Sequence, residues 1–373
     1  MKTRKQKYGQ YFTSEEMSKN IIKRVNNFKN IEGDVLEPSF GDGSFINPLL
    51  NYDVNIDAFE VDKDIFKNID GVNTELKDFI LDTSNKKYDF IVGNPPYIEL
   101  TYSFYDEEKR NEILDKYKKI CSGRLNLTHI FLYKSFNMIK KDGIIAYLLP
   151  SSILTSPYYS NIRMMIYKYF EIKYVEKDVK FKDVAIKVSL LILQRKNSDT
   201  KPYFVNYDDN YFICDNYKDY PKDTITFKEY GYKANIGEVV WNQQKEKLTT
   251  DKNNNVLVYS TNIGIDKLEL KDKISSDKDK KQYINESDIK YKNCIIIPRT
   301  VSKKIKYHLI LDNDKYIFEN HVIVITHESK EKLIELYNKF KNNKLDKYFQ
   351  LFFNSSNLSI TELNNIIVKE KEN

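Results

Sequence analysis

The stretch YDFIVGNPPYIE, residues 88–99, gives the clearest indication of the fold. Its first half is largely apolar and reads as a strand buried on both faces, which is typical of a parallel sheet. Similar runs, DVLEP, IDAFEV, GIIAYLLP and KVSLLILQR, recur between residues 34 and 195 and alternate with helical segments such as TSEEMSKNIIKRV and IFLYKSFNMIKK. This alternation predicts an α/β fold with a mostly parallel, twisted sheet.

Four residues follow the apolar run directly: Asn94, Pro95, Pro96 and Tyr97. In a parallel sheet, ligands bind beyond the carboxyl ends of the strands. The side-chain oxygen of Asn94 and the carbonyl of Pro95 are two acceptors that can bind one amino group, while the prolines hold the backbone extended. The Tyr97 ring offers a flat surface on which a planar base can stack. We interpret the tetrad as a rigid grip on an aromatic amine; the structural alternative is an ordinary exit from a strand into a loop.

A glycine turn follows the first strand, in VLEPSFGDGSF, residues 35–45. Glu37 stands at the strand end, and Pro38 and Gly41 lie in the turn. Glycines let the backbone approach a ligand closely and expose N–H groups at the start of a helix. A purely structural turn between a strand and a helix explains the same pattern equally well, so the turn alone decides nothing.

The next two strands also end on acids. AFEVD places Glu60 and Val61 about two dozen residues after the glycine turn, where an acid can accept hydrogen bonds from ribose hydroxyls. LKDFIL places Asp78 beside Phe79, an acceptor for an exocyclic amine next to a ring that can cover a purine. Acids also cap helices and phenylalanines fill cores, but three such strand ends in succession predict a nucleoside pocket.

In their order along the chain, these motifs resemble the gamma class of DNA adenine-N6 methyltransferases, typified by the TaqI enzyme and dependent on S-adenosylmethionine. GQYFT resembles the N-terminal cofactor motif of that class, LEPSFGDGSF its glycine loop, FEVD and KDF its ribose and adenine motifs, and NPPY its catalytic tetrad. The resemblance covers the catalytic half of the chain. It implies a Rossmann-like methyltransferase domain in a site-specific, restriction-modification type enzyme that methylates N6 of an adenine flipped out of double-stranded DNA.

The resemblance also implies roles for individual residues. Asn94, Pro95, Pro96 and Tyr97 would be catalytic, with Tyr97 and Phe181 stacking on the two sides of the flipped base. The residues implied to bind S-adenosylmethionine are Tyr11, Thr13, Glu37, Pro38, Gly41, Glu60, Val61, Asp78, Phe79 and Asn94. No metal is expected, because the sulfonium of the cofactor is already a good methyl donor and the enzyme chiefly has to place the amine.

The sequence pattern changes near residue 200. Short strand-like runs (VLVYS, CIIIPR, KYHLIL and HVIVIT) are then separated by polar loops rich in Asn and Lys, and the end of the chain reads as helical. A chain of 373 residues also suits two domains better than one. We predict a catalytic domain over residues 1–198 and an α+β target-recognition domain over residues 199–373 that reads the DNA sequence.

Charge and cysteine content indicate which partners and which metal or disulfide sites to expect. The chain has 60 Lys and Arg against 54 Asp and Glu, but residues 101–196 hold 18 basic against 10 acidic residues, which suits either a phosphate-facing side or a solvated lysine-rich surface. Cys121, Cys214 and Cys294 are isolated in the sequence, so neither a disulfide framework nor a zinc cluster is indicated.

The sequence also sets expectations about location and partners. It has no signal-peptide pattern and no long apolar run, so we expect a bacterial or phage-encoded cytoplasmic protein that does not enter the membrane and associates with the nucleoid through DNA. We expect a monomer that binds double-stranded DNA. A cognate restriction endonuclease can be present in the same cell without forming a stable complex with it.

Three other functions share part of the pattern. RNA adenine-N6 methyltransferases and protein glutamine-N5 methyltransferases also use an NPPY tetrad, and a nucleotide-binding module without activity is the third alternative. The glutamine enzymes have a helical domain before the catalytic domain and little after it, whereas here about 30 residues precede the first strand and roughly 175 follow the last. The long C-terminal region favours DNA recognition, and the intact tetrad favours an enzyme.

Overall fold

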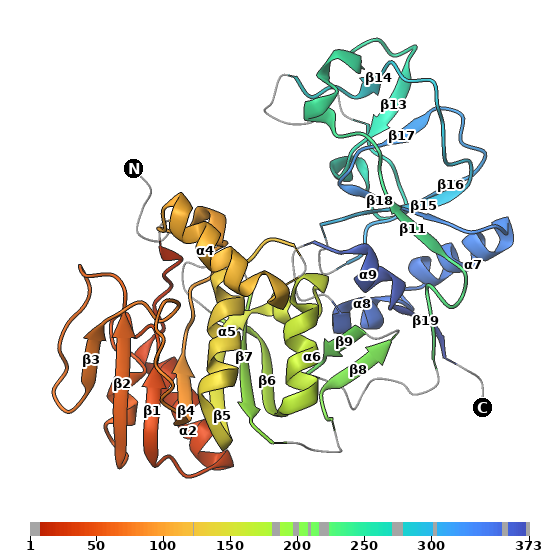
Figure 1. Ribbon diagram of the computed structural model, residues 1–373. Helices are drawn as coiled ribbons and strands as arrows, with labels where there is room; N and C mark the ends of the chain where they lie inside the picture. The colour runs from red at the N-terminus through yellow and green to blue at the C-terminus, as the bar shows by residue number, and fades with distance from the viewer. Residues whose placement is uncertain are drawn as a thin grey trace. The chain divides into compact units, whose positions relative to one another are not determined.

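The computed structural model describes two compact units, Met1–Tyr217 and Lys218–Asn373 (Figure 1). The described residues are 8–121, 123–180, 187–196, 201–207, 210–215, 224–270, 279–300, 304–352 and 357–370. Among them, no helix is both long enough and apolar enough to cross a membrane. Phe181, implied by the resemblance to stack on the target base, lies outside the described residues.

The first unit is built around a seven-stranded sheet with the order β3-β2-β1-β4-β5-β7-β6 (Figure 1). Its strands are β1 (Gly33–Glu37), β2 (Val54–Glu60), β3 (Asn73–Leu76), β4 (Tyr88–Gly93), β5 (Ile139–Pro150), β6 (Glu171–Val179) and β7 (Val188–Gln194). Strands β1 to β5 pair in parallel, and β7 is antiparallel to both of its neighbours. The predicted mostly parallel, Rossmann-like sheet is therefore confirmed. Strand order reverses between β1 and β4, and ligands bind beyond the strand ends at such a point.

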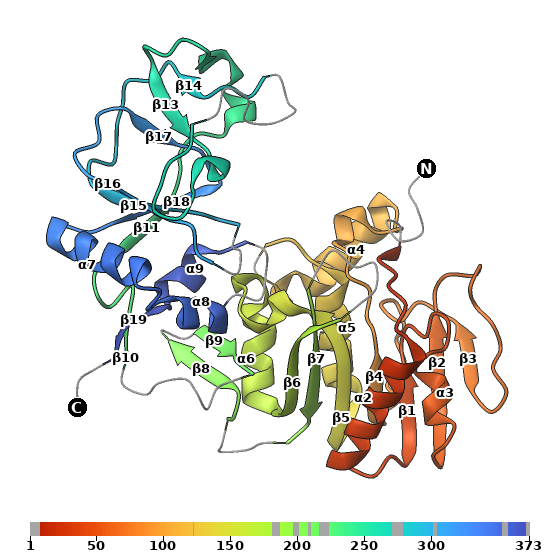
Figure 2. The same ribbon diagram turned by 180° about the vertical axis from the view of Figure 1, so that it is seen from behind.

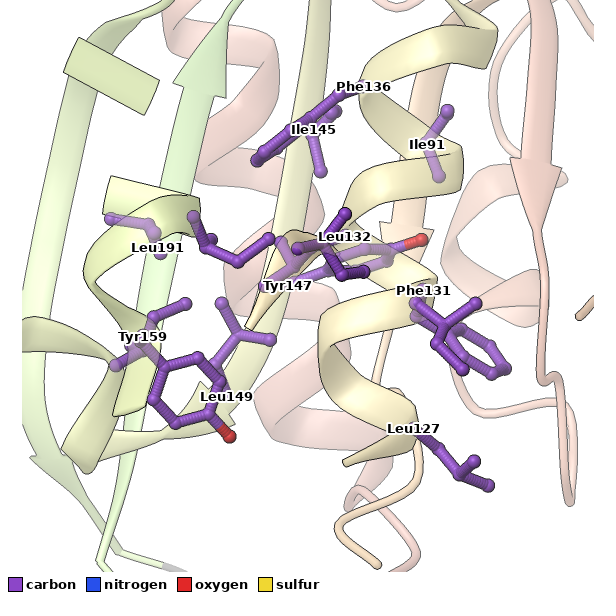
Figure 3. Close-up of a cluster of buried hydrophobic side chains, with 14 of the residues drawn as sticks. Ile91, Leu127, Phe131, Leu132, Phe136, Ile145, Tyr147, Leu149, Tyr159 and Leu191 are labelled. Atoms are coloured by element: carbon purple, nitrogen blue, oxygen red, sulfur yellow. The ribbon is translucent and has the colours of Figure 1, made fainter. Parts of the chain in front are cut away.

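Helices cover both faces of this sheet (Figures 1 and 2). They are α2 (Glu15–Phe28), α3 (Ile46–Leu49), α4 (Glu107–Tyr117), α5 (Leu127–Met138) and α6 (Ser160–Tyr169). Helix α2 packs Ile21, Ile22 and Val25 against one face, because these apolar residues recur at helical spacing. On the other face, side chains of α5 pack with Tyr147 and Leu149 of β5 in one buried cluster (Figure 3). Two apolar layers thus hold the central strands, and their carboxyl ends, in fixed positions.

The first unit extends about 19 residues beyond the expected boundary at residue 198. Strands β8 (Phe204–Tyr207) and β9 (Asn210–Ile213) form an antiparallel hairpin that contacts α6. The fully buried Arg163 of α6 donates hydrogen bonds to the carbonyls of Ile153, Ser156 and Tyr211. Since a buried guanidinium has to be satisfied by acceptors, this side chain ties the hairpin to the rest of the first unit.

The second unit contains two four-stranded sheets and a two-stranded pair. Sheet β11-β18-β15-β16 is antiparallel, whereas sheet β12-β14-β13-β17 contains the parallel pair β13 and β17. The strands are β10 (Thr224–Thr226), β11 (Lys233–Ile236), β12 (Leu248–Thr249), β13 (Asn255–Val258), β14 (Tyr283–Ile284), β15 (Cys294–Pro298), β16 (His308–Ile310), β17 (Tyr316–Phe318), β18 (Val322–Thr326) and β19 (Ile367–Glu370). The helices are α7 (Lys330–Lys341), α8 (Asp346–Phe352) and α9 (Ile360–Asn364). Residues of β13, β15, β17 and β18 form a hydrophobic core within this second unit.

Candidate active site

A cavity opens beyond the carboxyl ends of β1, β2 and β4 in the first unit. Its empty volume is about 760 Å³, including the solvent at its mouth. Its lining includes these residues singled out from the sequence: Tyr11, Thr13, Pro38, Gly41, Glu60, Val61, Asp78, Phe79, Asn94 and Pro96. Segments far apart in the sequence thus meet at one place, as strand ends of a parallel sheet are expected to do. Glu37, Pro95 and Tyr97 are not part of the lining.

The side-chain amide of Asn94 is held in one orientation. Its Nδ2 donates hydrogen bonds to the carbonyl of Tyr11, at 2.7 Å, and to the hydroxyl of Thr13, at 3.2 Å. Its Oδ1 accepts a hydrogen bond from the hydroxyl of Tyr97. Because the amide donates through nitrogen and accepts through oxygen, these partners fix which end faces which neighbour. The segment before α2 is therefore joined to the tetrad.

The backbone and ring of the tetrad are also held from outside it. The Thr128 hydroxyl of α5 donates to the Pro96 carbonyl at 2.9 Å, whereas the Pro95 carbonyl has no hydrogen-bond donor among the residues that the structure describes. The ring of Tyr97 stacks on that of Tyr11, with centroids 5.5 Å apart and planes inclined by 27°. Burial raises the pKa of Tyr97 well above that of an exposed tyrosine. Its hydroxyl therefore remains a hydrogen-bond donor at neutral pH.

Glu60 connects two loops at the cavity wall. Its Oε2 accepts a hydrogen bond from the Gly41 N–H at 2.9 Å, and its Oε1 accepts from the N–H groups of Val61 and Asp62, at 2.9 and 2.8 Å. A carboxylate offers about four acceptor positions. Three are used here, which leaves capacity for a hydroxyl group in the cavity. Burial raises the pKa of Glu60 despite the three backbone donors.

Glu37 lies beside Gly93, not in the cavity lining. The side chain is 1% exposed, and a Cβ added to Gly93 would come within 2.3 Å of its Oε1, so only glycine fits there. Oε1 accepts from the Ser39 N–H at 3.3 Å, while the buried Oε2 has no hydrogen-bond partner among the residues that the structure describes. Burial raises the pKa of Glu37 well above the usual value, and the nearby carboxylates of Glu60 and Asp42 raise it further. The ionised form of this buried carboxyl therefore needs a positively charged or hydrogen-bonding partner nearby.

Asp78 is anchored through both oxygens of its carboxylate. Oδ1 accepts from the Ile80 N–H at 2.8 Å, and Oδ2 accepts from the Tyr105 hydroxyl at 2.8 Å. The neighbouring Phe79 ring packs against Phe131 of α5, with centroids 4.9 Å apart. An acceptor and a flat ring therefore stand side by side in the lining, which suits a purine with an exocyclic amine.

Several aromatic residues that the sequence interpretation missed complete the lining. They are Tyr8, Phe12, Phe104, Tyr105 and Phe131. Phe131 has the spacing of a core residue in α5, so nothing in the sequence separates it from its buried neighbours. The adjacent pair Phe104 and Tyr105 was the one available signal, because two aromatic residues in a polar stretch before α4 need a partner to pack on.

Comparisons with known proteins match the chain with methyltransferases of restriction-modification systems. Residues 5–186 match the family model described as Eco57I restriction-modification methylase. The Type II methyltransferase M.AccI of Acinetobacter calcoaceticus is 29% identical over 277 residues, which are 69% of this chain and 50% of that protein. The modification methylase CviBIII of Paramecium bursaria Chlorella virus NC1A is 28% identical over 353 residues, 87% of this chain and 84% of that protein.

The chain matches only part of the length of some of these proteins. The type IIG restriction endonuclease BpuSI covers 96% of this chain, and this chain 59% of BpuSI, with a TM-score of 0.43 and 11% identity. The chain spans about half the length of M.AccI.

Proposed function

We propose that the methyltransferase domain at residues 5–186, which is of the restriction-modification type, methylates the N6 amine of adenine at specific sites in double-stranded DNA. The single observation that carries the proposal is the fixed amide of Asn94. Asn94 lines the cavity and is followed in sequence by Pro95, and its Oδ1 accepts a hydrogen bond from the Tyr97 hydroxyl.

S-adenosylmethionine is the cofactor of this domain, and when bound it supplies an electrophilic methyl group. The cavity lining suits it chemically. Glu60 would accept hydrogen bonds from its ribose, and Asp78 and Phe79 would bind its adenine. The carboxylate of Asp42, which also lines the cavity, would favour its positive charge. These residue assignments belong to the proposal.

Asn94 would act on the target amine. Its Oδ1 and the Pro95 carbonyl would each accept a hydrogen bond from one N–H of the amine, which draws the nitrogen toward tetrahedral geometry and makes its lone pair available. The hydrogen bonds from Asn94 Nδ2 to Tyr11 and Thr13 keep the oxygen in place while this occurs. Once methylated, the nitrogen carries a positive charge and is acidic, so it can release one proton to solvent and no strongly basic group is required of the chain.

Tyr97 would bind the base by its ring face. Inside a duplex the N6 amine is paired, so the adenine has to leave the stack at a cost of about a few kcal/mol, offset partly by stacking worth ~1–3 kcal/mol. Tyr11 now covers one face of the Tyr97 ring. We propose that the base takes a place on this aromatic surface, and that Phe181 supplies a second ring.

We also propose that the second unit, Lys218–Asn373, reads the DNA sequence. Its separate core supports a module that can vary independently of the catalytic unit. In this proposal the protein acts on DNA as a cytoplasmic monomer, without a stable complex with a restriction endonuclease.

Expression in a host without DNA methylation tests the proposal directly. We expect modified adenines across the genome at one short sequence motif, and no modification with the Asn94→Ala variant as the matched control. If methyl groups were found only in RNA, or only on protein glutamine, that molecule and not DNA would be the substrate. Absence of any methyl transfer by pure protein given DNA carrying all short motifs would overturn the proposal.

A further inference from the structure

We infer that Tyr105 is a positioning residue that sets the preference of the cofactor pocket for an aminopurine, by holding the carboxylate of Asp78. The inference rests on the proposed role of Asp78 in binding the adenine of the cofactor. It assigns a function to a side chain that no sequence motif singled out.

The carboxylate of Asp78 is fixed at both ends. The N–H groups of Ile80 and Leu81 bind Oδ1, at 2.8 and 3.4 Å, and the Tyr105 hydroxyl binds Oδ2 at 2.8 Å. The two N–H groups come from the same loop as Asp78, whereas Tyr105 is 27 positions away. Among the described residues, Tyr105 is therefore the hydrogen-bond partner from outside the loop that stops the carboxylate from turning about its Cβ–Cγ bond.

Tyr105 is itself held firmly. The residue is 7% exposed, Arg110 Nη1 donates to its carbonyl at 3.0 Å, and the Phe104 ring lies 4.2 Å from its ring. Burial raises the pKa of Tyr105 far above that of an exposed tyrosine, so the hydroxyl stays protonated and acts as the donor to Asp78. A buried donor with a fixed ring can orient an acceptor without moving itself.

The chemistry of the purine explains why this orientation matters. A carboxylate oxygen accepts a hydrogen bond from a 6-amino group but repels a 6-keto oxygen, because both of those oxygens are acceptors. Discrimination of this kind requires the carboxylate oxygen to stay directed at the 6 position. If Tyr105 releases Oδ2, the carboxylate can turn away and the two purines become more alike in affinity.

Binding calorimetry with two ligands tests the inference. The probes are S-adenosylhomocysteine and S-inosylhomocysteine, which carries a keto oxygen in place of the 6-amino group. For Tyr105→Phe we expect S-adenosylhomocysteine to bind roughly 5–30-fold more weakly and S-inosylhomocysteine to change by less than about 2-fold. The ratio of the two dissociation constants should shrink accordingly.

Tyr117→Phe is the matched control. Tyr117 is also buried in the same apolar cluster, and its hydroxyl donates to the Ile80 carbonyl at 3.4 Å, but it does not touch the Asp78 carboxylate. This variant should leave the ratio of dissociation constants unchanged. Thermal melting of both variants should show comparable small losses of stability, since each removes one buried hydroxyl.

A double-mutant cycle completes the test. In an Asp78→Ala background, the Tyr105→Phe change should have no further effect on the ratio, because the acceptor that Tyr105 holds is absent. Equal weakening of both ligands by Tyr105→Phe, or an unchanged ratio, would overturn the inference. The calorimetry involves no DNA, so the inference about Tyr105 can fail while genomic adenine methylation persists. The inference and the proposed function are therefore tested separately.

Discussion

The Tyr97 hydroxyl donates a hydrogen bond to Asn94 Oδ1, the oxygen that we propose accepts a hydrogen bond from the target amine. An amide oxygen has two lone pairs, so it can accept from both donors at once or release the hydroxyl when the amine arrives. The amide, the hydroxyl and the ring of these two residues therefore have separable roles. Variants of each residue can distinguish them.

Asn94→Ala should abolish most methyl transfer. The change removes the proposed acceptor of the amine and the two hydrogen bonds that tie the tetrad to the segment before α2. We expect single-turnover methyl transfer to slow by at least about 10²–10³-fold, the usual cost of removing one positioned polar group from a reacting centre. DNA affinity in a gel-shift assay should change little. Wild-type methylation by this variant would contradict the mechanism.

Tyr97 should act through its ring and not through its hydroxyl. Tyr97→Phe keeps the stacking surface and should retain most activity, whereas Tyr97→Ala should lose it, because stacking is worth ~1–3 kcal/mol per base. With 2-aminopurine at the target position, fluorescence should rise when wild-type protein binds and extrudes the base, although contact with the ring quenches part of the rise. Tyr97→Ala should shorten the time that the base spends outside the helix. Equal activity of the two variants would remove the stacking role.

The sheet and most of the cavity could be predicted because they follow from local patterns. Apolar runs of strand length define the strands, and parallel strands bring their carboxyl ends to one edge. Residues directly after these runs, such as Glu60, Asp78 and Asn94, therefore meet in the cavity lining without any knowledge of the packing.

Other features depend on packing between distant segments and could not be predicted. Glu37 also ends a strand, yet it lies against Gly93, because which side of a strand end a carboxylate occupies is decided by its neighbours. Tyr105 reaches Asp78 across 27 positions, and no spacing rule relates a loop residue to a strand end. Arg163 binds the Tyr211 carbonyl across 48 positions, a contact that composition does not reveal.

Glu60→Ala should weaken cofactor binding and also destabilise the domain. The variant leaves the N–H groups of Gly41, Val61 and Asp62 without their acceptor, and it removes the proposed partner of the ribose. We expect binding of S-adenosylhomocysteine to weaken by ~1–3 kcal/mol in calorimetry, with a lower melting temperature. Glu112→Ala, on the exposed side of α4, is the matched control and should alter neither quantity. Unchanged affinity in Glu60→Ala would remove Glu60 from the cofactor site.

Glu37 should make the ligand-free protein less stable as the pH rises. The folded-state pKa of Glu37 lies well above 4.5, chiefly because burial disfavours the charged carboxylate, while the unfolded chain has the ordinary value. Between these two pKa values the folded state binds more protons than the unfolded state, so the free energy of unfolding falls with rising pH. The fall should end once the pH passes the folded-state pKa.

Glu37→Gln should flatten this dependence. Glutamine keeps an oxygen that can accept from the Ser39 N–H but cannot ionise, so the melting temperature should fall less steeply as the pH rises above 4.5. Part of the slope should remain, since burial also raises the pKa of Glu60. For the Asp57 carboxylate, burial raises the pKa but the hydrogen bonds from Lys86, Asn73 and Tyr88 together lower it by more, so this group should act only at lower pH and in the opposite direction. Identical slopes for wild type and Glu37→Gln would show that the titration of Glu37 does not cause this loss of stability.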